Sequence, residues 1–505
     1  MAFETNKFNV VKKKRLASSE FAVECNVETG VEIDKILSVQ HHTEIETVEI
    51  LSGTINYNGN IDLSVVFSTP DGEIGTTSAV CPFSSKFEDE DVMLGDKVTI
   101  SVSILDFQVS SVANGTIKIS CTCEQKGILI SNKEVMHADS EADDICLKKD
   151  DITVNMFTGQ AQEVFEVESV VSIKEPIKKI VMTDSQASIK SVESGDNFVG
   201  VNGEVITKIL YITQNDRFET SYTSETFKEE VELEGATREN VVDAEVYVKN
   251  SLVRCEVEEE DKGVKIKMTI PVKLIANAYE EKKESIVKDL YSTKNELQVS
   301  TESFEMTKQY QTETFETKID GALTLDEDKP RVDKIMFVGA SNLLITNSYI
   351  KDGELFVEGI AKTNVVYLND ETNALHSVVI EVPFVVSDKT NIDADDVNVF
   401  VVAMLYDVDV VVKKGREFYF DGKLRVTASY DADVVEAVIS NVENGAERKE
   451  KDCAIEVYFG SEGDDSWNIA KGLGIDEQTL YEQNPETVFP LEKDENLVVY
   501  YQKKA

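Results

Sequence analysis

The strongest constraint on the fold of this 505-residue chain is a motif that occurs three times. Two charged residues and an isoleucine stand at 34–36, 178–180 and 333–335, and a glycine follows 25 or 26 residues later. An aromatic residue stands eight residues after each glycine, and a phenylalanine follows 16 or 17 residues after that. These landmarks are Gly59, Phe67 and Phe83; Gly203, Tyr211 and Phe227; and Gly359, Tyr367 and Phe384. Chance does not keep four landmarks in register in three copies, so we predict three homologous units.

Each unit has the sequence pattern of β-strands. Apolar and polar residues alternate in segments such as 61–65 and 265–270, where Val, Ile and Thr are frequent. Turns are expected at Asp71-Gly72, Asp352-Gly353 and Asp421-Gly422. The sequence therefore predicts a mainly β fold of three homologous antiparallel β-sandwich-like domains. We expect each landmark glycine to permit a bulge or a close backbone approach, with its aromatic residue on the same core-facing side.

The predicted domains are residues 1–150, 151–305 and 306–448, followed by a small domain at 452–503. Each β domain is expected to take a leading strand from 20–27, 162–173 or 313–325. The acidic stretches at 138–144 and 325–329 are expected to be solvated connectors or loops. One helix is expected inside the second domain, at 279–290.

The charge balance excludes several classes of partner. The chain has 95 acidic and 51 basic residues, for a net charge of −44. Nucleic acids and anionic lipids need clustered Lys and Arg, so we expect neither as a partner. A basic or polar partner would complement such a surface, although an acidic surface that only aids solubility explains the same composition.

No segment suggests export or membrane insertion. The N-terminus lacks an apolar signal region, and the longest apolar run, 399–406, is far short of the ~20 residues of a spanning helix. Seven cysteines, an odd count, fit a reducing compartment, and Cys121 and Cys123 are expected to be core thiols. We expect a cytoplasmic protein with no signal peptide and no transmembrane segment.

Motifs of catalysis are missing as well. The histidines, His41, His42, His137 and His376, do not have metal-ligand spacing, and the chain has neither a nucleophile elbow nor a phosphate-binding loop. Carboxylates are so abundant that pairs of them carry no information. We therefore expect no enzyme, no catalytic residue, no cofactor and no metal.

The last fifty residues change to a strand–helix–helix–strand pattern. A short strand is expected at 454–459 and a capped helix start at 463–471, ended by Gly472 and Gly474. Asp476 is expected to cap a second helix at 477–483, with Leu480 facing inward, and Asn484-Pro485 to stop it. A final strand is expected at 497–501.

This pattern resembles a LysM module, a βααβ fold. The family's G-D-T-L-x-x-I-A helix start stands here at 463–470, followed by Ile475, Leu480 and Asn484-Pro485. Ser466 departs from the usual apolar leucine, and Asp465 departs from the usual threonine. LysM modules bind N-acetylglucosamine chains in a shallow groove, and the resemblance implies a groove formed by Gly463, Asp464, Asp465, Ile475, Asn484 and Pro485.

Several of these residues have structural alternatives. Gly463, Asp464 and Pro485 also suit capping and turning. Trp467, the only tryptophan, is a candidate partner-binding hot spot, with a partly buried anchor as the alternative. The module is strongly acidic, which disfavours a glycan that bears carboxylates and favours a protein ligand.

Three β repeats followed by a LysM module resemble the clostridial spore-coat morphogenetic proteins that carry SPOCS domains. The resemblance implies a non-enzymatic scaffold of the mother-cell cytoplasm that settles on the forespore surface. Its LysM domain would bind the coat-base ATPase, stage IV sporulation protein A. Its three similar β surfaces, linked in one chain, would hold other coat proteins or copies of the chain itself with avidity. The main alternative is a peptidoglycan- or cortex-binding protein; an adhesin or appendage subunit is a third reading, disfavoured by the lack of an export signal.

Overall fold

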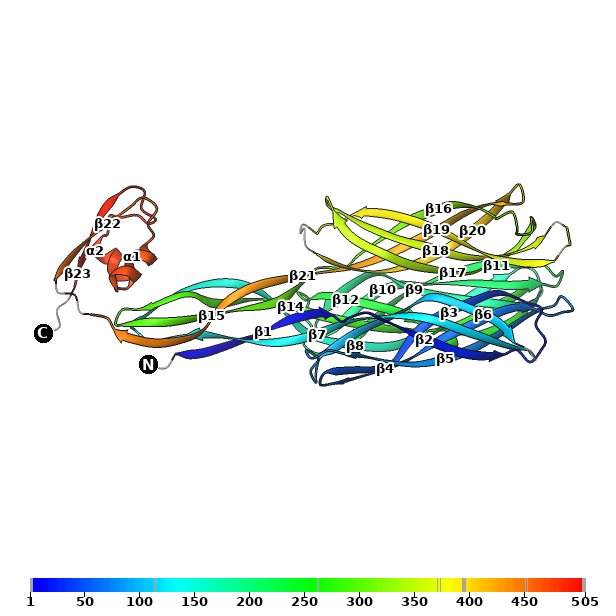
Figure 1. Cartoon of the computed structure of the whole chain (residues 1–505), viewed down its shortest axis with the longest axis horizontal. Coiled ribbons are helices and arrows are strands. Elements are labelled where there is room, and N and C mark those ends of the chain that lie inside the picture. Colours follow the sequence, from blue (N-terminus) through cyan, green and yellow to red (C-terminus); the bar gives the residue numbers. More distant parts are fainter. Residues whose placement is uncertain are drawn as a thin grey trace.

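The computed structural model describes residues 3–112, 115–260, 263–369, 371–372, 374–392, 397–449, 451 and 453–501. Three β repeats form a head, strands continue from the head as a stem, and a small C-terminal module lies at the tip of the stem, near the N-terminus (Figure 1). The predicted fold class is confirmed: antiparallel sheets recur in three units, and the chain ends in a βααβ module.

Each repeat contains two sheets. One is a three-stranded meander, and the other is built on one long strand. The meanders are β3 (Lys35–Leu51), β4 (Thr54–Ser68) and β5 (Ile74–Glu88); β9 (Ile177–Gly195), β10 (Phe198–Thr213) and β11 (Phe218–Glu232); and β17 (Val332–Lys351), β18 (Glu354–Asn369) and β19 (Leu375–Lys389).

The second sheets contain the predicted leading strands, which are confirmed as β2, the second half of β8, and β16. Their members are β2 (Ser19–Glu28), β6 (Lys97–Val112) and β7 (Thr116–Asp139); β8 (Ile145–Ile173), β12 (Val241–Val248), β13 (Arg254–Glu260) and β14 (Gly263–Ser292), with the 3₁₀ turn η1 (Asn250–Leu252); and β16 (Glu313–Thr324), β20 (Asn398–Lys413) and β21 (Glu417–Glu447). The two sheets of each repeat enclose one hydrophobic core. The edges of the two sheets lie close together at β2/β5, β8/β11 and β16/β19.

The landmark glycines occupy the same register position in all three repeats. Each glycine lies directly opposite the landmark phenylalanine of the next strand, and the preceding strand has a β-bulge beside it. A Cβ on Gly203 would lie 2.6 Å from the carbonyl oxygen of Ser188 and against the ring of Phe227. The ring thus fills the space that a side chain would take, and the predicted close approach and bulge are confirmed.

The isoleucine landmark pairs with the aromatic landmark. Ile36 lies opposite Phe67, and the corresponding isoleucine and aromatic residues pair in the other two repeats. A second bulge lies directly beside this pair in all three repeats. One buried cluster contains equivalent residues of all three repeats. These residues directly precede the landmark aromatic residue of each repeat and are Val66, Leu210 and Val366. The repeats therefore meet around a pseudo-threefold axis at the end of the head away from the stem. The three units thus pack against one another as one body.

The stem consists of three two-stranded ribbons. They pair β1 (Glu4–Arg15) with the end of β7, the start of β8 with the end of β14, and β15 (Asn295–Gln309) with the end of β21. Apolar side chains from all three ribbons share a core that includes Phe8, Val154 and Val438. The 29 residues of β8 extend over roughly 95 Å at ~3.3 Å per residue, so head and stem share continuous strands. The predicted boundaries after residues 150 and 305 fall inside β8 and β15.

Two local predictions are wrong, and a third, that both acidic stretches are solvated connectors or loops, holds except at two buried residues. Residues 279–290 form no helix: they belong to β14 and pair with β8. Burying Ile286 and Val287 in the stem outweighs the helix propensity of the Glu and Lys residues at 280–284. Asp421-Gly422 lies inside β21, opposite β16, although the turns at Asp71-Gly72 and Asp352-Gly353 are confirmed. The acidic stretches are not wholly solvated, because Asp144 is buried and accepts a hydrogen bond of 3.0 Å from Ser292 Oγ, and Leu325 lies in the core of the third repeat.

The cysteines include a pair that the sequence did not reveal. Cys25 of β2 and Cys81 of β5 form a disulfide, which links the two sheets of the first repeat. Cys121 and Cys123 are buried core thiols as expected, and burial raises the pKa of Cys123 to about 11. In the described part of the chain, no helix is long and apolar enough to cross a membrane.

Candidate partner-binding site

The C-terminal module has the predicted order of elements: β22 (Ile455–Gly460), α1 (Ser466–Leu473), α2 (Glu477–Gln483) and β23 (Glu495–Tyr500). Asp465 caps α1 by accepting a hydrogen bond from Asn468 N, and Asp476 caps α2 in the same way from Thr479 N. Gly474 ends α1 in the left-handed conformation. Leu480 is fully buried, as predicted.

The first loop of the predicted groove is held by hydrogen bonds within the module. Gly463 has a φ of 92° and donates its N–H to Leu491 O at 2.8 Å. The carboxylate of Asp464 accepts a hydrogen bond of 2.9 Å from Ser461 N, and the backbone of Asp464 pairs with Leu491. Together with the capping role of Asp465, these contacts assign the loop's carboxylates to local structure.

The second loop is held separately. Asn484 accepts a hydrogen bond of 2.9 Å from Val498 N and donates to Leu480 O and Val498 O, which ties the end of α2 to β23. Pro485 is exposed. Among the described residues, no hydrogen bond joins this loop to Gly463 or Asp464.

Trp467 and Ile475 lie where the module contacts the stem. The indole Nε1 of Trp467 donates to Asp289 Oδ2 at 2.7 Å, and its ring packs edge-to-face on Tyr291, with 4.9 Å between centroids. Lys471 forms an ion pair with Asp289 at 2.7 Å. Tyr291 also donates its hydroxyl to Ile475 O at 2.8 Å. The structure thus places Trp467 as a buried anchor between module and stem.

The charge of Asp289 is stabilised in this contact. Burial alone would raise its pKa, but the hydrogen bonds from Lys471 and Trp467 outweigh burial and lower the pKa. Arg448 adds hydrogen bonds to Asn295 O in the stem and to Lys471 O in α1. An ion pair and an aromatic contact therefore hold the module in one orientation on the stem.

Ser466 stands where the LysM pattern has an apolar leucine, and hydrogen bonds compensate for the polar side chain. Its buried hydroxyl donates to Glu477 Oε1 at 2.6 Å and accepts from Tyr481 Oη at 3.0 Å. A polar residue is tolerated here because both of its hydrogen-bonding roles are filled.

An exposed apolar surface lies on the side of the module's sheet away from the helices. We call Ile455, Val457, Phe459, Val498 and Tyr500 the outer sheet face. Ile455 is 53% and Phe459 76% exposed, and cross-strand pairs place all five side chains on one side. The residues at 455–459 predicted a strand but not its orientation, because the inner side carries Glu456 and Tyr458 while the more apolar Ile455, Val457 and Phe459 face away from the helices.

The first two repeats match a known family. Residues 32–112 and 176–257 each match the family model described as SipL, SPOCS domain. Two of the repeats are thus similar to the SPOCS domain of sporulation proteins. The third repeat lies outside the match but has the same two bulges and the same glycine–phenylalanine pair, which extends the structural likeness to it. Comparison with curated proteins and with solved structures found no match.

Proposed function

We propose that this chain is a non-enzymatic scaffold of spore-coat assembly. Its LysM-like module binds the coat-base ATPase, stage IV sporulation protein A, and helps to localise coat to the forespore surface. The similarity of two repeats to SPOCS domains supports a role in sporulation. Any hydrolysis of ATP belongs to the partner.

The observation that carries the protein-binding part is the outer sheet face. Exposed apolar patches with polar surroundings are typical of protein-protein contact sites. The predicted groove residues are largely engaged in caps and loop contacts, whereas Ile455, Val457 and Phe459 have no covering element among the described residues.

The stem gives this face a defined direction. Because Trp467, Lys471 and Tyr291 hold the module on the stem, and the stem strands continue into the head, a partner on the outer sheet face stands at a set distance from the repeats. The scaffold is therefore a rigid spacer.

The test is binding of the purified full chain to the ATPase by biolayer interferometry. Phe459→Ser should weaken binding at least tenfold, since it removes the most exposed apolar side chain of the face. The matched control is Val488→Ser, which changes an exposed apolar loop residue of the same module outside the sheet and should bind like the wild type. Equal binding by wild type and Phe459→Ser would refute this use of the face.

A glycan ligand is the second candidate. Tyr481 is 45% exposed and packs edge-to-face on Phe489, close in sequence to the Asn484-Pro485 loop, and exposed aromatics stack on sugar rings. Cosedimentation with purified peptidoglycan separates the two candidates. Pelleting of the full chain that is insensitive to salt and lost in Tyr481→Ala would favour the glycan.

A further inference from the structure

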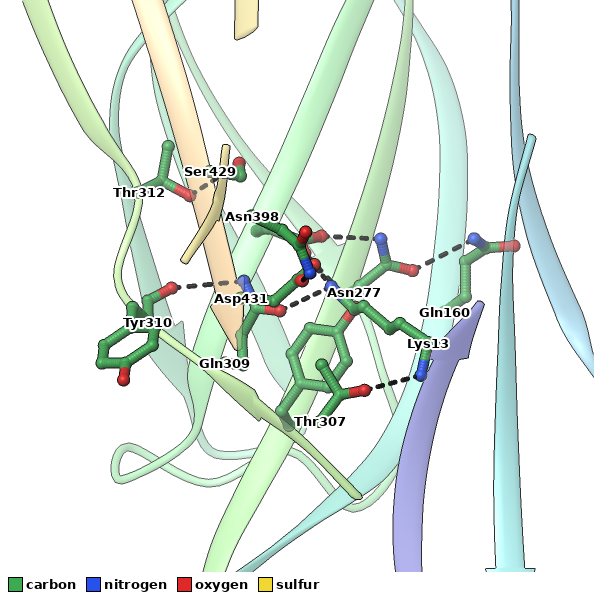
Figure 2. Close-up of polar contacts among 12 residues, drawn as sticks. Lys13, Gln160, Asn277, Thr307, Gln309, Tyr310, Thr312, Asn398, Ser429 and Asp431 are labelled. Carbon is green, nitrogen blue, oxygen red and sulfur yellow. Dashed lines mark hydrogen bonds and ion pairs between the residues drawn. The ribbon is translucent and has the colours of Figure 1, made fainter. Parts of the chain in front are cut away.

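The head contains a chamber that the proposed function does not use. The cavity has a volume of about 890 Å³ and is lined by residues of all three repeats. Leu37, a member of the buried cluster around Val66, lines one end. Lys13 and Asp431 line the other end, at the base of the stem, where polar side chains of β1, β8, β14, β15, β20 and β21 converge (Figure 2). The volume is in the range of ligand pockets, ~300–1,000 Å³.

The chamber reaches the surface along β19. Two alternate residues of this strand line the chamber: Val379 is 52% exposed, and the side chain of Glu381 is 54% exposed. The same face of β19 continues to Val385, which is 64% exposed and is not a lining residue. Ser103 and Asp106 of the first repeat are exposed lining residues as well. The continuous face of β19 gives a small molecule a route from solvent into the chamber.

A carboxylate of the second repeat faces the chamber. Glu245 and Tyr247 of β12 both line it, and Glu245 Oε2 accepts a hydrogen bond from the Tyr247 hydroxyl. Among the described residues, no hydrogen bond reaches the other oxygen, Oε1. Burial raises the pKa of Glu245 to about 7, although the hydrogen bond with Tyr247 acts in the opposite direction. Glu245 thus presents an acceptor oxygen to a space large enough for a ligand.

The cationic side chains that line the chamber already have acidic partners. The ion pairs join Lys13 to Asp243, Lys362 to Glu381, and Arg425 to Glu204. In the part of the chain that the structure describes, none of these cations forms an ion pair with Asp106, Glu245 or Asp431. These three carboxylates leave the chamber with an excess of negative charge. They would attract a cationic ligand and repel an anionic one such as a phosphate ester.

Much of the chamber wall is apolar. Val379 of β19, Phe400 and Val402 of β20, and Leu105 and Phe107 of β6 line it. A small inorganic cation would leave these side chains in contact with water, whereas the apolar part of an organic molecule would cover them. The wall and the carboxylates together therefore suit a ligand that is apolar over most of its surface and cationic at one end.

We propose that the chamber binds a small organic amine with an apolar body. The ammonium group donates a hydrogen bond to Glu245 Oε1, and the apolar body packs against Val379, Phe400 and Val402. Burial of the apolar body supplies affinity, and the charge-assisted hydrogen bond selects against neutral and anionic molecules. A lysine side chain of a partner protein carries the same ammonium group without such a body, and the test distinguishes the two.

The test is a fluorescence titration of the full chain with dansylcadaverine, a primary amine on an aromatic body, at pH 8 and physiological salt. Its matched control is N-pentyl dansylamide, which has the same body and chain length but no ammonium group. We expect saturable binding of dansylcadaverine, with an affinity at least tenfold higher than that of the neutral probe. Equal affinity for the two probes, or no saturation by the amine up to ~1 mM, would overturn the proposal.

Two variants locate the site. Glu245→Gln keeps the shape of the side chain but removes its charge, so it should reduce the affinity for dansylcadaverine to that of the neutral probe. Glu256→Gln changes an exposed carboxylate on β13 of the same repeat, outside the chamber lining, and should bind like the wild type. Far-UV circular dichroism checks that both are folded, and the comparison of the two probes on wild type depends on neither variant. Undiminished binding by folded Glu245→Gln would overturn the assignment of the site.

A third probe tests the class of ligand. Nα-acetyl-lysine N-methylamide represents a lysine side chain of a partner protein. It should bind at least tenfold more weakly than dansylcadaverine, because it has no apolar body to cover Val379 and Phe400. Equal or tighter binding of this probe would overturn a small organic amine as the ligand.

Discussion

The indole Nε1 of Trp467 donates a hydrogen bond of 2.7 Å to Oδ2 of Asp289, a stem residue 178 positions earlier in the chain. The same carboxylate pairs with Lys471, so one stem residue holds two residues of α1. The single tryptophan of the protein therefore reports on the contact between module and stem.

Asp289→Ala should release the module from the stem. Trp467 would lose its hydrogen-bond acceptor and become exposed to water, so its fluorescence emission should shift to longer wavelength while the β signal in circular dichroism stays unchanged. Asp494→Ala is the control, since Asp494 accepts a hydrogen bond from Glu462 N within the module and, among the described residues, forms none to the stem. An unchanged emission maximum in Asp289→Ala would contradict the docking role.

The chamber carboxylate Glu245 should make stability depend on pH. Its pKa is raised from 4.5 to about 7 by burial, so the folded state holds this proton more tightly than the unfolded state. The stability that this tighter proton binding contributes is fully present below pH ~4.5 and is lost as pH rises through about 7. Glu245→Gln, which stays neutral, should match the wild type in urea midpoint at pH 5 and exceed it at pH 8.

The control for this measurement is Glu492→Gln at an exposed position of the module. It should show the same difference from wild type at both pH values. A constant difference for Glu245→Gln as well would rule out the pH dependence.

A side chain at the landmark glycine should destabilise the second repeat. In Gly203→Ala the new Cβ would collide with the backbone oxygen of Ser188 and the ring of Phe227, which cannot both move away. Overpacking of this kind costs ~1–3 kcal/mol. Gly159→Ala is the matched control, because its nearest neighbour, Leu233 Cδ2, is at an ordinary 3.5 Å. Chemical denaturation of both variants measures the difference, and equal midpoints would disprove the steric role.

The disulfide between Cys25 and Cys81 should stabilise the first repeat. The two residues are separated by 56 positions, and closing a loop of that length contributes ~4 kcal/mol in the chain-entropy description. The double variant Cys25→Ser/Cys81→Ser should melt at a lower temperature than oxidised wild type and be insensitive to dithiothreitol. Peptide mapping without reductant should find the Cys25–Cys81 peptide, and its absence from oxidised protein would refute the bond.

Much of the fold was predictable because its determinants are local. The repeat of Gly203 and Tyr211, and its two counterparts, marks strands whose period of two is visible in the residues themselves. Asp465, Gly474 and Asp476 signal helix ends through backbone groups that only neighbouring side chains satisfy. These features depend on residues a few positions apart.

The candidate sites were harder to predict. Trp467 was expected either to bind a partner or to be buried, and only the position of Asp289 and Tyr291 distinguishes the two. The chamber left no local signal, since its edges belong to strands that look like any others. The helix expected at 279–290 failed for the same reason, because its Glu and Lys residues suit a helix until β8 pairs with them.

The amino-acid sequence by itself determined three β repeats, their bulges at landmark residues and the capped βααβ module, because strand alternation and helix capping are short-range. The tertiary structure alone decided that the repeats enclose a chamber, that long strands form a stem and that Trp467 rests on Asp289. Such contacts depend on burying surfaces from residues more than a hundred positions apart, and no local pattern records which surfaces will meet.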